Sequence, residues 1–266
     1  MPLPLGVDQA QILKAVQALL KHIQKQKKQT NELIEEDELI YLQVSLKKTP
    51  QHSRKDKPLR IPVPHSLYDY DGAELCLIVK DRQGEGHKAA KERVRQEKLA
   101  KVAKVIGLSK LKSKYESHEA KRNLCAQYDM FLADDRIIPL LPKLIGKKFF
   151  QKKKQPIPVD LTVKDWAGQV RKATEATYMY HTGGTSLSIR AARSSFTAKQ
   201  SAENVAAVIE GALQHIPRKW SNVQSLFLRT AESAALPIYQ EVPEQRMRIP
   251  MAAGEAADAP AASAIS

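Results

Sequence analysis

Residues 128–146 of the 266-residue chain read YDMFLADDRIIPLLPKLIG, and this stretch decides the fold class. Its first part, Tyr128 to Ala133, is a short apolar run typical of a buried strand. Its second part, Asp135 to Ile145, predicts a helix that Gly146 ends. A strand followed directly by a helix is the unit from which parallel α/β sheets are built.

The preceding residues repeat this pattern. Leu75 to Val79 is another continuous apolar run, and a long lysine-rich helix is predicted after it, from Lys88 to Ile106. Ser117 to Ala126 predicts the helix that leads into the quoted stretch. Strands alternating with helices over residues 75–146 imply a small parallel sheet covered by helices. A loop from Lys147 to Pro158, rich in lysine and proline, marks its boundary.

The N-terminal segment has two different periodicities. Apolar residues recur every three or four positions from Asp8 to Ile23, which predicts an amphipathic helix. Alternation follows over Leu39 to Leu46, with Tyr41, Gln43 and Ser45 on the more polar face, and this predicts a half-buried strand. Leu59 to Pro64 contains two prolines and allows only an edge or irregular strand.

The C-terminal segment predicts two helices and about three strands. We expect a helix from Val163 to Thr177, then a strand pair, Tyr178 to His181 with Leu187 to Ala191, around Gly183-Gly184. Thr197 and Gln200 have the spacing of a capping box at the start of a helix that runs to Ile216. Leu226 to Leu228 predicts the last strand.

Neither end segment can close a fold alone, but together they can form an antiparallel sheet packed by helices. We therefore predict an α/β protein with a discontinuous α+β outer domain, residues 8–70 plus 159–240, into which a Rossmann-like α/β domain, residues 71–158, is inserted. The alanine-rich tail, residues 241–266, has little apolar bulk, and we expect it to be disordered.

Charge points to a polyanionic partner. The chain carries a formal net charge of +14, and residues 75–158 contain 21 Lys and Arg against 9 Asp and Glu, so this central segment alone carries a net charge of +12. Such an excess attracts nucleic acid at long range. We expect a soluble protein that is not secreted, without a membrane partner, because no run approaches a spanning helix and the N-terminus does not resemble a signal peptide.

Two basic clusters stand out. The first is on the predicted helix after residue 87, and the second is in the boundary loop. They comprise Lys88, Lys91, Arg93, Arg95, Lys98, Lys101 and Lys104, and Lys147, Lys148, Lys152, Lys153 and Lys154. A solvated helix face is the alternative for the first cluster. The second could contact phosphates, act as a nuclear import signal, or be a plain basic loop.

The sequence offers little catalytic chemistry. Gly84-Glu-Gly86 could approach a phosphate before a helix, but an ordinary turn explains it as well, and no P-loop motif occurs. The carboxylates Asp134 and Asp135 fit a turn or helix start. Cys76 and Cys125 sit among apolar residues without metal-ligand spacing, so we expect buried, reduced thiols. We expect no enzyme, no cofactor and no metal. A nucleotide-binding α/β enzyme, with its site at residues 84–88, remains the alternative of a different class.

Three segments resemble the ribosomal protein L-one family. They are residues 131–146 quoted above, Ser195-Phe196 with the following helix that ends at Ile216, and residues 219–230, KWSNVQSLFLRT. They occur in the family's order and spacing, and the resemblance covers about residues 8–240. It implies the same two-domain fold with a discontinuous outer domain, and it implies binding to ribosomal RNA.

Two positions depart from the family pattern. Ribosomal members usually carry Ser-Thr-Met-Gly after the last strand, whereas this chain reads Thr230-Ala-Glu-Ser233, and Glu36 stands near an expected aromatic residue. These departures, with the lysine-rich insertion, resemble the eukaryotic L-one-like ribosome-assembly factors. The absence of long extensions resembles the compact fungal type associated with the small-subunit processome and the U-three snoRNA particle.

The expected function is that of a non-catalytic scaffold that binds structured pre-ribosomal RNA and other assembly proteins in the nucleus and nucleolus, as a monomer within a large ribonucleoprotein. A structural protein of the large-subunit stalk is the alternative. Strand ends of the outer domain would clamp phosphates or meet ribose hydroxyls, and lysines would add phosphate contacts; surface solubility is the alternative role for each strand-end residue. The expected RNA-binding residues are Arg190, Arg193, Ser195, Arg229, Thr230, Lys47, Lys48, Arg54, Lys55 and Lys57, with Lys147, Lys148, Lys152, Lys153 and Lys154.

Overall fold

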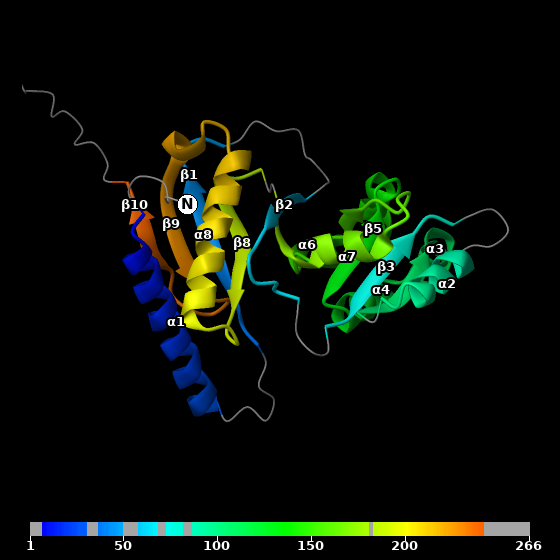
Figure 1. Cartoon of the computed structure of the whole chain (residues 1–266), viewed down its shortest axis with the longest axis horizontal. Helices are drawn as coiled ribbons and strands as arrows, with labels where there is room; N and C mark the ends of the chain where they lie inside the picture. Colours follow the sequence, from blue (N-terminus) through cyan, green and yellow to red (C-terminus); the bar gives the residue numbers. More distant parts are fainter. Residues whose placement is uncertain are drawn as a thin grey trace, which may run out of the picture.

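The computed structural model describes residues 7–30, 37–49, 58–68, 73–81, 87–99, 101–180 and 183–241. These residues form two lobes that lie side by side, each built on its own four-stranded sheet (Figure 1). One sheet is antiparallel and the other parallel, which confirms the predicted fold class.

The antiparallel sheet combines both ends of the chain. Its order is β10-β9-β1-β8, with β1 (Leu39–Leu46) between β8 (Ser186–Arg193) and β9 (Val223–Arg229), and with β10 (Leu236–Gln240) at one edge. Helices α1 (Gln9–Thr30) and α8 (Ala198–His215) cover one face (Figure 1). Strand β1 alternates as predicted, so its apolar side chains enter the core beneath these helices.

Helix α8 begins where the sequence predicts. The Gln200 amide nitrogen donates to Thr197 Oγ1 at 3.3 Å, and the Thr197 amide nitrogen donates to Gln200 Oε1 at 3.0 Å, which completes the capping box. Further along α8, Gly211 allows β2 (Leu59–Pro62) to approach closely, because a Cβ there would collide with the Ile61 side chain. Strand β2 pairs with β7 (Ala176–Met179) in a separate two-stranded sheet.

The parallel sheet has the order β4-β3-β5-β6. Its strands are β3 (Leu75–Val79), β4 (Val102–Gly107), β5 (Met130–Asp134) and β6 (Ile157–Val159). One face packs against α2 (Lys88–Gln96) and α7 (Trp166–Thr174). The other packs against α3 (Leu108–Lys114), α4 (His118–Gln127), the 3-10 turn η1 (Ile138–Leu140), α5 (Leu141–Ile145) and α6 (Lys147–Gln151).

The packing bears on the proposed domain division. Trp166, Val170 and Ala173 of α7 belong to the hydrophobic cluster on the parallel sheet, although the sequence division places residues from 159 onward in the outer domain. We keep an outer and an inserted domain as a proposal, with α7 grouped by its packing with the inserted one. We call the part built on the antiparallel sheet the outer lobe and the part built on the parallel sheet the inserted lobe.

The predicted long helix from Lys88 to Ile106 is wrong. Helix α2 ends at Gln96, Lys98 has a positive φ of 50°, and the chain then forms β4 parallel to β3. The β-branched side chains Val102, Val105 and Ile106 are buried on the sheet, which favours a strand. Regularly spaced lysines on both elements obscured the change of period in the sequence.

The predicted loop from Lys147 to Pro158 contains ordered elements, α6 and β6. Phe149 fixes α6, because its fully buried ring lies 4.9 Å from that of Phe131, centroid to centroid, in an edge-on arrangement. The basic cluster of this segment is therefore held in a defined geometry.

Three expectations for the C-terminal half also need correction. The predicted strand pair around Gly183-Gly184 is wrong, since β7 pairs with β2 and β8 pairs with β1. The helix predicted to start at Val163 starts after Asp165, whose carboxylate accepts from the Gly168 amide at 2.7 Å, and it ends before β7. Strand β10 was missed, because Pro237 interrupts its pattern.

Both cysteines are buried and free, as expected. Burial raises the pKa of Cys76 to about 12, so this thiol stays protonated and unreactive. The expected disorder of residues 241–266 falls, apart from Glu241, outside the described residues.

Candidate nucleic-acid interface

The outer sheet has a second face, opposite α1 and α8. On β1 this face carries Tyr41, Gln43 and Ser45, all partly exposed. The strand register places Tyr41 beside Arg190 of β8 on one side and beside Arg229 of β9 on the other. Because directly paired residues of neighbouring strands point to the same face, two arginines flank one tyrosine there.

A lysine from the inserted lobe reaches the same place. Lys153 follows α6 with a left-handed φ of 52°, and its Nζ lies 5.5 Å from the centroid of the Tyr41 ring. The same ammonium donates to the Ser188 carbonyl oxygen of β8 at 3.4 Å. A non-glycine residue adopts a positive φ at some energetic cost, so the local fold holds this lysine over the sheet against that cost.

Lys153, Arg190 and Arg229 form what we call the cationic cluster. Burial lowers the pKa of the Lys153 ammonium, and Arg190 and Arg229 lower it further. The charged neighbours that shift this pKa are thus both cations. A phosphate placed here would relieve their mutual repulsion.

Arg190 connects the two lobes. Its Nη1 donates to the Tyr68 hydroxyl at 2.9 Å, and its Nη2 donates to the carbonyl oxygens of Lys152 and Lys153 at 3.1 and 3.2 Å. Burial disfavours the charged guanidinium, but three tyrosines, at positions 41, 68 and 180, outweigh this effect and raise its pKa. Arg190 therefore holds the Lys153 backbone in place, which makes it a positioning residue of the cluster.

Two more of the expected strand-end residues are engaged within the chain. Arg193 Nη1 donates to the Leu67 carbonyl at 3.1 Å, and its Nε lies 4.0 Å from a carboxylate oxygen of Asp37. Thr230 is fully buried, and its Oγ1 accepts from the Ser233 amide at 3.1 Å while its own amide donates to the Ser233 hydroxyl. Thr230 thus closes the turn after β9.

The other expected residues differ in exposure. Arg229 and Ser195 are exposed at the ends of β9 and β8, and Lys48, Lys147, Lys148 and Lys152 are exposed as well. Lys47 pairs with Glu241 at 2.5 Å. Lys154 donates to the Tyr128 carbonyl at 2.7 Å and to that of Cys125 at 3.3 Å, where it caps α4. Arg54, Lys55 and Lys57 lie outside the described residues, as do Glu36 and Gly84-Glu-Gly86.

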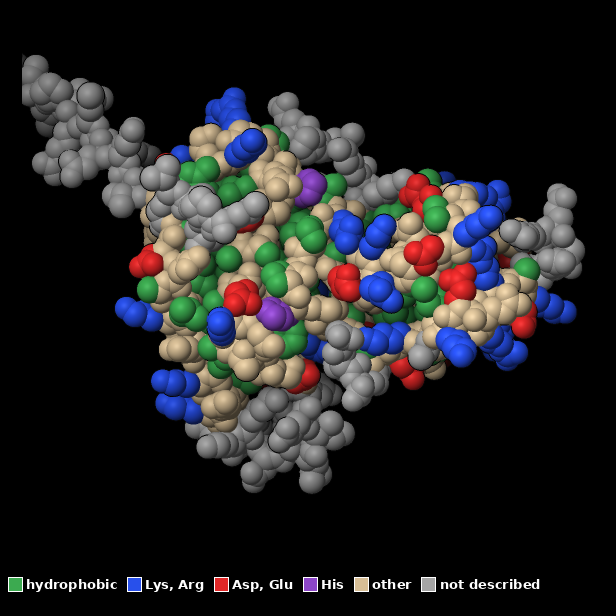
Figure 2. Space-filling view, viewed as in Figure 1, with side chains coloured by type: hydrophobic (Ala, Val, Ile, Leu, Met, Phe, Trp, Pro, Cys, Tyr) green, Lys and Arg blue, Asp and Glu red, His purple; other side chains and the backbone are tan. Residues whose placement is uncertain are grey.

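The first basic cluster divides between elements. Lys88, Lys91, Arg95 and Lys98 are exposed on and just after α2, whereas Lys101 and Lys104 lie before and within β4. Figure 2 shows many Lys and Arg side chains on the inserted lobe, interspersed with carboxylates. This surface is suited to many weak phosphate contacts.

The sequence predicts the three cations of the cluster as RNA-binding residues, but it does not predict the tyrosines around them. Tyr41 could have been found, because the alternation of residues 39–46 already puts it on the polar face. Tyr68 and Tyr180 carry no such signal, since their place beside Arg190 depends on the path between the lobes.

The described residues contain no cluster of three or more His, Cys, Asp or Glu side chains suited to a metal ion. None of their helices is both long enough and apolar enough to cross a bilayer.

Comparison with known proteins matches residues 7–234 to the ribosomal protein L1p/L10e family. A ribosome biogenesis protein of Schizosaccharomyces pombe is 37% identical over 252 residues, which cover 88% of this chain and 66% of the relative. The mouse ribosomal L1 domain-containing protein 1 is 31% identical over 242 residues, covering 88% of this chain and 52% of the relative. The large ribosomal subunit protein uL1 of Methanocorpusculum labreanum is 22% identical over 145 residues, covering 54% and 68%.

The chain thus spans about two thirds of the length of the yeast relative and about half that of the mouse relative. The family model extends over both lobes, from α1 to the turn after β9. With this match and the two-lobed fold, the chain belongs to the ribosomal protein L1p/L10e family.

Proposed function

We propose that this protein is a pre-ribosomal RNA-binding scaffold of ribosome biogenesis, and that its cationic cluster contacts the RNA backbone. The family is non-catalytic and its members bind ribosomal RNA, so the enzyme alternative is not retained. The observation that carries the proposal is Lys153, which is held over Tyr41, the residue that the strand register places between Arg190 and Arg229.

The cluster suits a folded RNA in three ways. Arg229 is exposed and can take a phosphate through paired hydrogen bonds. Tyr41 offers a ring face beside it, and Gln43 and Ser45 continue the same face with groups that can meet ribose hydroxyls. The exposed lysines of α6 and α2 would add contacts that are independent of sequence.

The relatives favour an assembly factor over a structural ribosomal protein. Identity is 31–37% with the biogenesis and L1 domain-containing relatives but 22%, over half of the chain, with the archaeal ribosomal protein. The Thr230 hydroxyl closes a turn and is turned away from solvent, so we do not retain it as an RNA contact. We propose a place in early nucleolar precursor particles, with the small-subunit processome as the specific assembly and neighbouring assembly proteins as further partners.

Charge reversal tests the surface. Arg229→Glu should weaken binding to structured pre-ribosomal RNA by about tenfold or more, since it replaces a phosphate contact with repulsion. Lys21→Glu on α1 is the matched control, because it makes the same charge change on an exposed position of the helix-covered side. If the two variants weakened RNA binding equally, the affinity would depend on net charge alone and not on the position of Arg229, which would refute the proposed surface.

Sedimentation tests the assembly. A tagged chain should co-sediment with precursor particles and with early pre-ribosomal RNA, and it should be absent from translating ribosomes. Its recovery in translating ribosomes at the level of other large-subunit proteins would favour the stalk alternative.

A further inference from the structure

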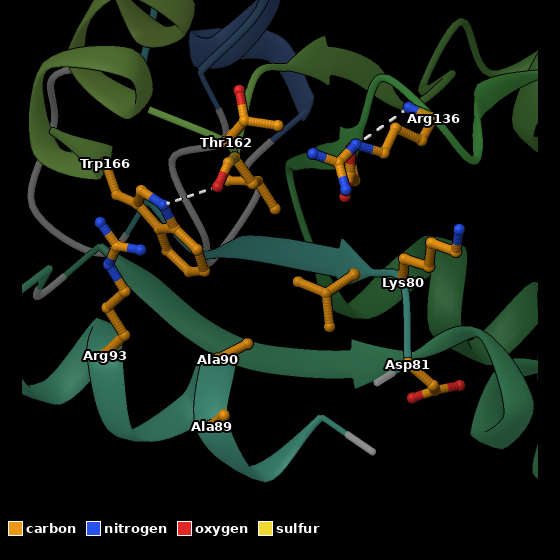
Figure 3. A pocket seen from close by; sticks show the side chains of 11 residues that line it. Lys80, Asp81, Ala89, Ala90, Arg93, Arg136, Thr162 and Trp166 are labelled. Atoms are coloured by element: carbon orange, nitrogen blue, oxygen red, sulfur yellow. Dashed lines mark hydrogen bonds between the residues drawn. The ribbon is translucent and has the colours of Figure 1, made fainter. Parts of the chain in front are cut away.

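A cleft of about 570 Å³ opens in the inserted lobe (Figure 3), and no residue of the cationic cluster lines it. It lies at the carboxyl ends of β3 and β5, since Val79 and Asp134 end these strands and both line it. From β3 the chain first adds β4 on one side and then β5 on the other, so the connections diverge at this point. In open α/β sheets this divergence creates the crevice in which ligands bind.

One end of the cleft is apolar and fixed. Trp166 forms a wall there (Figure 3), and Leu161 also lines the cleft. The small side chains of Ala89 and Ala90 on α2 leave space beside Trp166. The Trp166 Nε1 donates to the Leu161 carbonyl at 3.2 Å, and the Arg93 guanidinium lies 4.5 Å from the indole centroid. These contacts hold the wall in place without a ligand, which lowers the cost of binding.

Arg93 is itself anchored. Its Nη2 donates to the Lys164 carbonyl at 2.5 Å, and its Nε donates to Glu97 at 3.1 Å. The Arg93 guanidinium is therefore engaged by partners within the chain, and it forms part of the wall.

The other end of the cleft is charged. Lys80 and Arg136, both exposed, extend from the loops after β3 and β5 (Figure 3). Of the two carboxylates there, Asp81 accepts from the Ser109 amide at 2.5 Å. Asp134 is only 7% exposed and accepts from the Arg136 amide at 3.1 Å. A carboxylate offers about four acceptor positions, so Asp134 can accept further hydrogen bonds.

We propose that this cleft binds a nucleoside monophosphate unit. The base would lie at the Trp166 end, over Ala89 and Ala90. A ribose hydroxyl would donate to Asp134, and the phosphate would lie between Lys80 and Arg136. An apolar wall, a buried carboxylate and two exposed cations line the same cleft, so the base, the sugar and the phosphate each have a partner of suitable chemistry.

This chemistry has two sources, a free nucleotide or one unstacked nucleotide of an RNA chain. The second would give the inserted lobe an RNA contact that depends on single-stranded structure. The site is separate from the cationic cluster, so it can fail without affecting the proposed function.

Tryptophan fluorescence can test the site. The chain has two tryptophans, so Trp220→Phe in the full-length protein leaves Trp166 as the only reporter. Adenosine and guanosine monophosphates, inorganic phosphate and a short single-stranded RNA are titrated separately, at moderate salt. We expect saturable quenching by a mononucleotide, and weaker binding of inorganic phosphate because it lacks the base and sugar.

Two variants separate this site from general charge attraction. Ala89→Leu fills the base end without changing charge, and Arg136→Gln removes a phosphate partner; each should weaken binding at least about tenfold. Lys91→Gln, on the exposed side of the same helix, is the matched control and should bind as the parent does. Circular dichroism and melting temperature verify that each variant is folded.

The outcomes distinguish the sources. Quenching by mononucleotides identifies a free-nucleotide site, and quenching by the single strand alone, lost in Ala89→Leu, identifies an RNA-chain site. The proposal is overturned if neither the mononucleotides nor the single-stranded RNA changes Trp166 fluorescence up to millimolar concentration. It is also overturned if Ala89→Leu and Arg136→Gln are folded and both bind like the parent. Duplex RNA binding should be unchanged in Ala89→Leu, since it depends on the other surfaces.

Discussion

Replacing Arg190 with Met should destabilise the fold while leaving the net exposed charge of the strand ends almost unchanged. The guanidinium donates three hydrogen bonds, and two of them share Nη2, so about two charge-assisted bonds are lost. At about 1.5–3 kcal/mol each, the gross loss is about 3–6 kcal/mol. Releasing a buried charge offsets part of this. We expect a net loss of about 2–3 kcal/mol, because Met keeps the apolar volume.

For a chain of this size, such a loss lowers the melting temperature by about 5–10 °C. Differential scanning calorimetry of the parent, Arg190→Met and Arg229→Met measures it. Arg229 is exposed, so its replacement should change stability by only about 0.5 kcal/mol or less.

RNA titrations in increasing salt should give a different result for each variant. Arg229→Met removes one direct phosphate contact and should reduce the salt slope by about one. Arg190→Met should weaken binding through the released Lys153, and Arg190→Lys should rescue this only in part, because one ammonium cannot replace the fork of donors. If Arg190→Met melts like the parent, or if Arg229→Met loses as much stability, the assignment of one arginine to the fold and the other to the ligand is wrong.

Three further changes test individual features. Burial and two arginines lower the pKa of Lys153, so the unfolded chain keeps this proton to a higher pH than the folded chain does. The contribution of Lys153 to the free energy of unfolding should therefore become more favourable as the pH rises from the lowered pKa towards 10.5. RNA affinity should fall over the same pH range, because the lysine loses its charge. Stability and RNA binding are each measured as a function of pH, and Lys153→Arg should remove the part of each pH dependence that Lys153 causes. Gly211→Ala should cost about 1–3 kcal/mol by urea denaturation, since its Cβ meets Ile61; an unchanged midpoint would contradict the close packing of β2 on α8. Thr197→Ala should cost about 1 kcal/mol through loss of the cap on α8, and a neutral effect in the same assay would show that Gln200 alone suffices.

The sequence predicts those parts of the fold in which each helix or strand has a single, clear spacing of apolar residues. The alternation of β1 and the capping box of α8 are local signals, and the composite outer sheet follows from counting strands at both ends. The prediction of one helix from Lys88 to Ile106 was wrong because lysines at helical spacing continue from α2 into β4. These charged residues masked the change from helix to strand.

The candidate site was predictable in its residues but not in its geometry. Arg229 stands at a strand end, and Lys153 lies in a basic run, which the sequence shows. That Lys153 lies over Tyr41 depends on a positive φ and on Phe149, which fixes α6 from within the core. For the same reason Lys154, one residue further on, caps α4 instead of facing a ligand.

Crosslinking the purified full chain to bound pre-ribosomal RNA, followed by identification of the crosslinked peptides, tests the central claim most directly. RNA adducts should concentrate at Tyr41, at the segment containing Lys152 and Lys153, and at Arg229, which together mark the open face of the outer sheet. Adducts confined to α1 and α8, on the opposite face, would contradict the account.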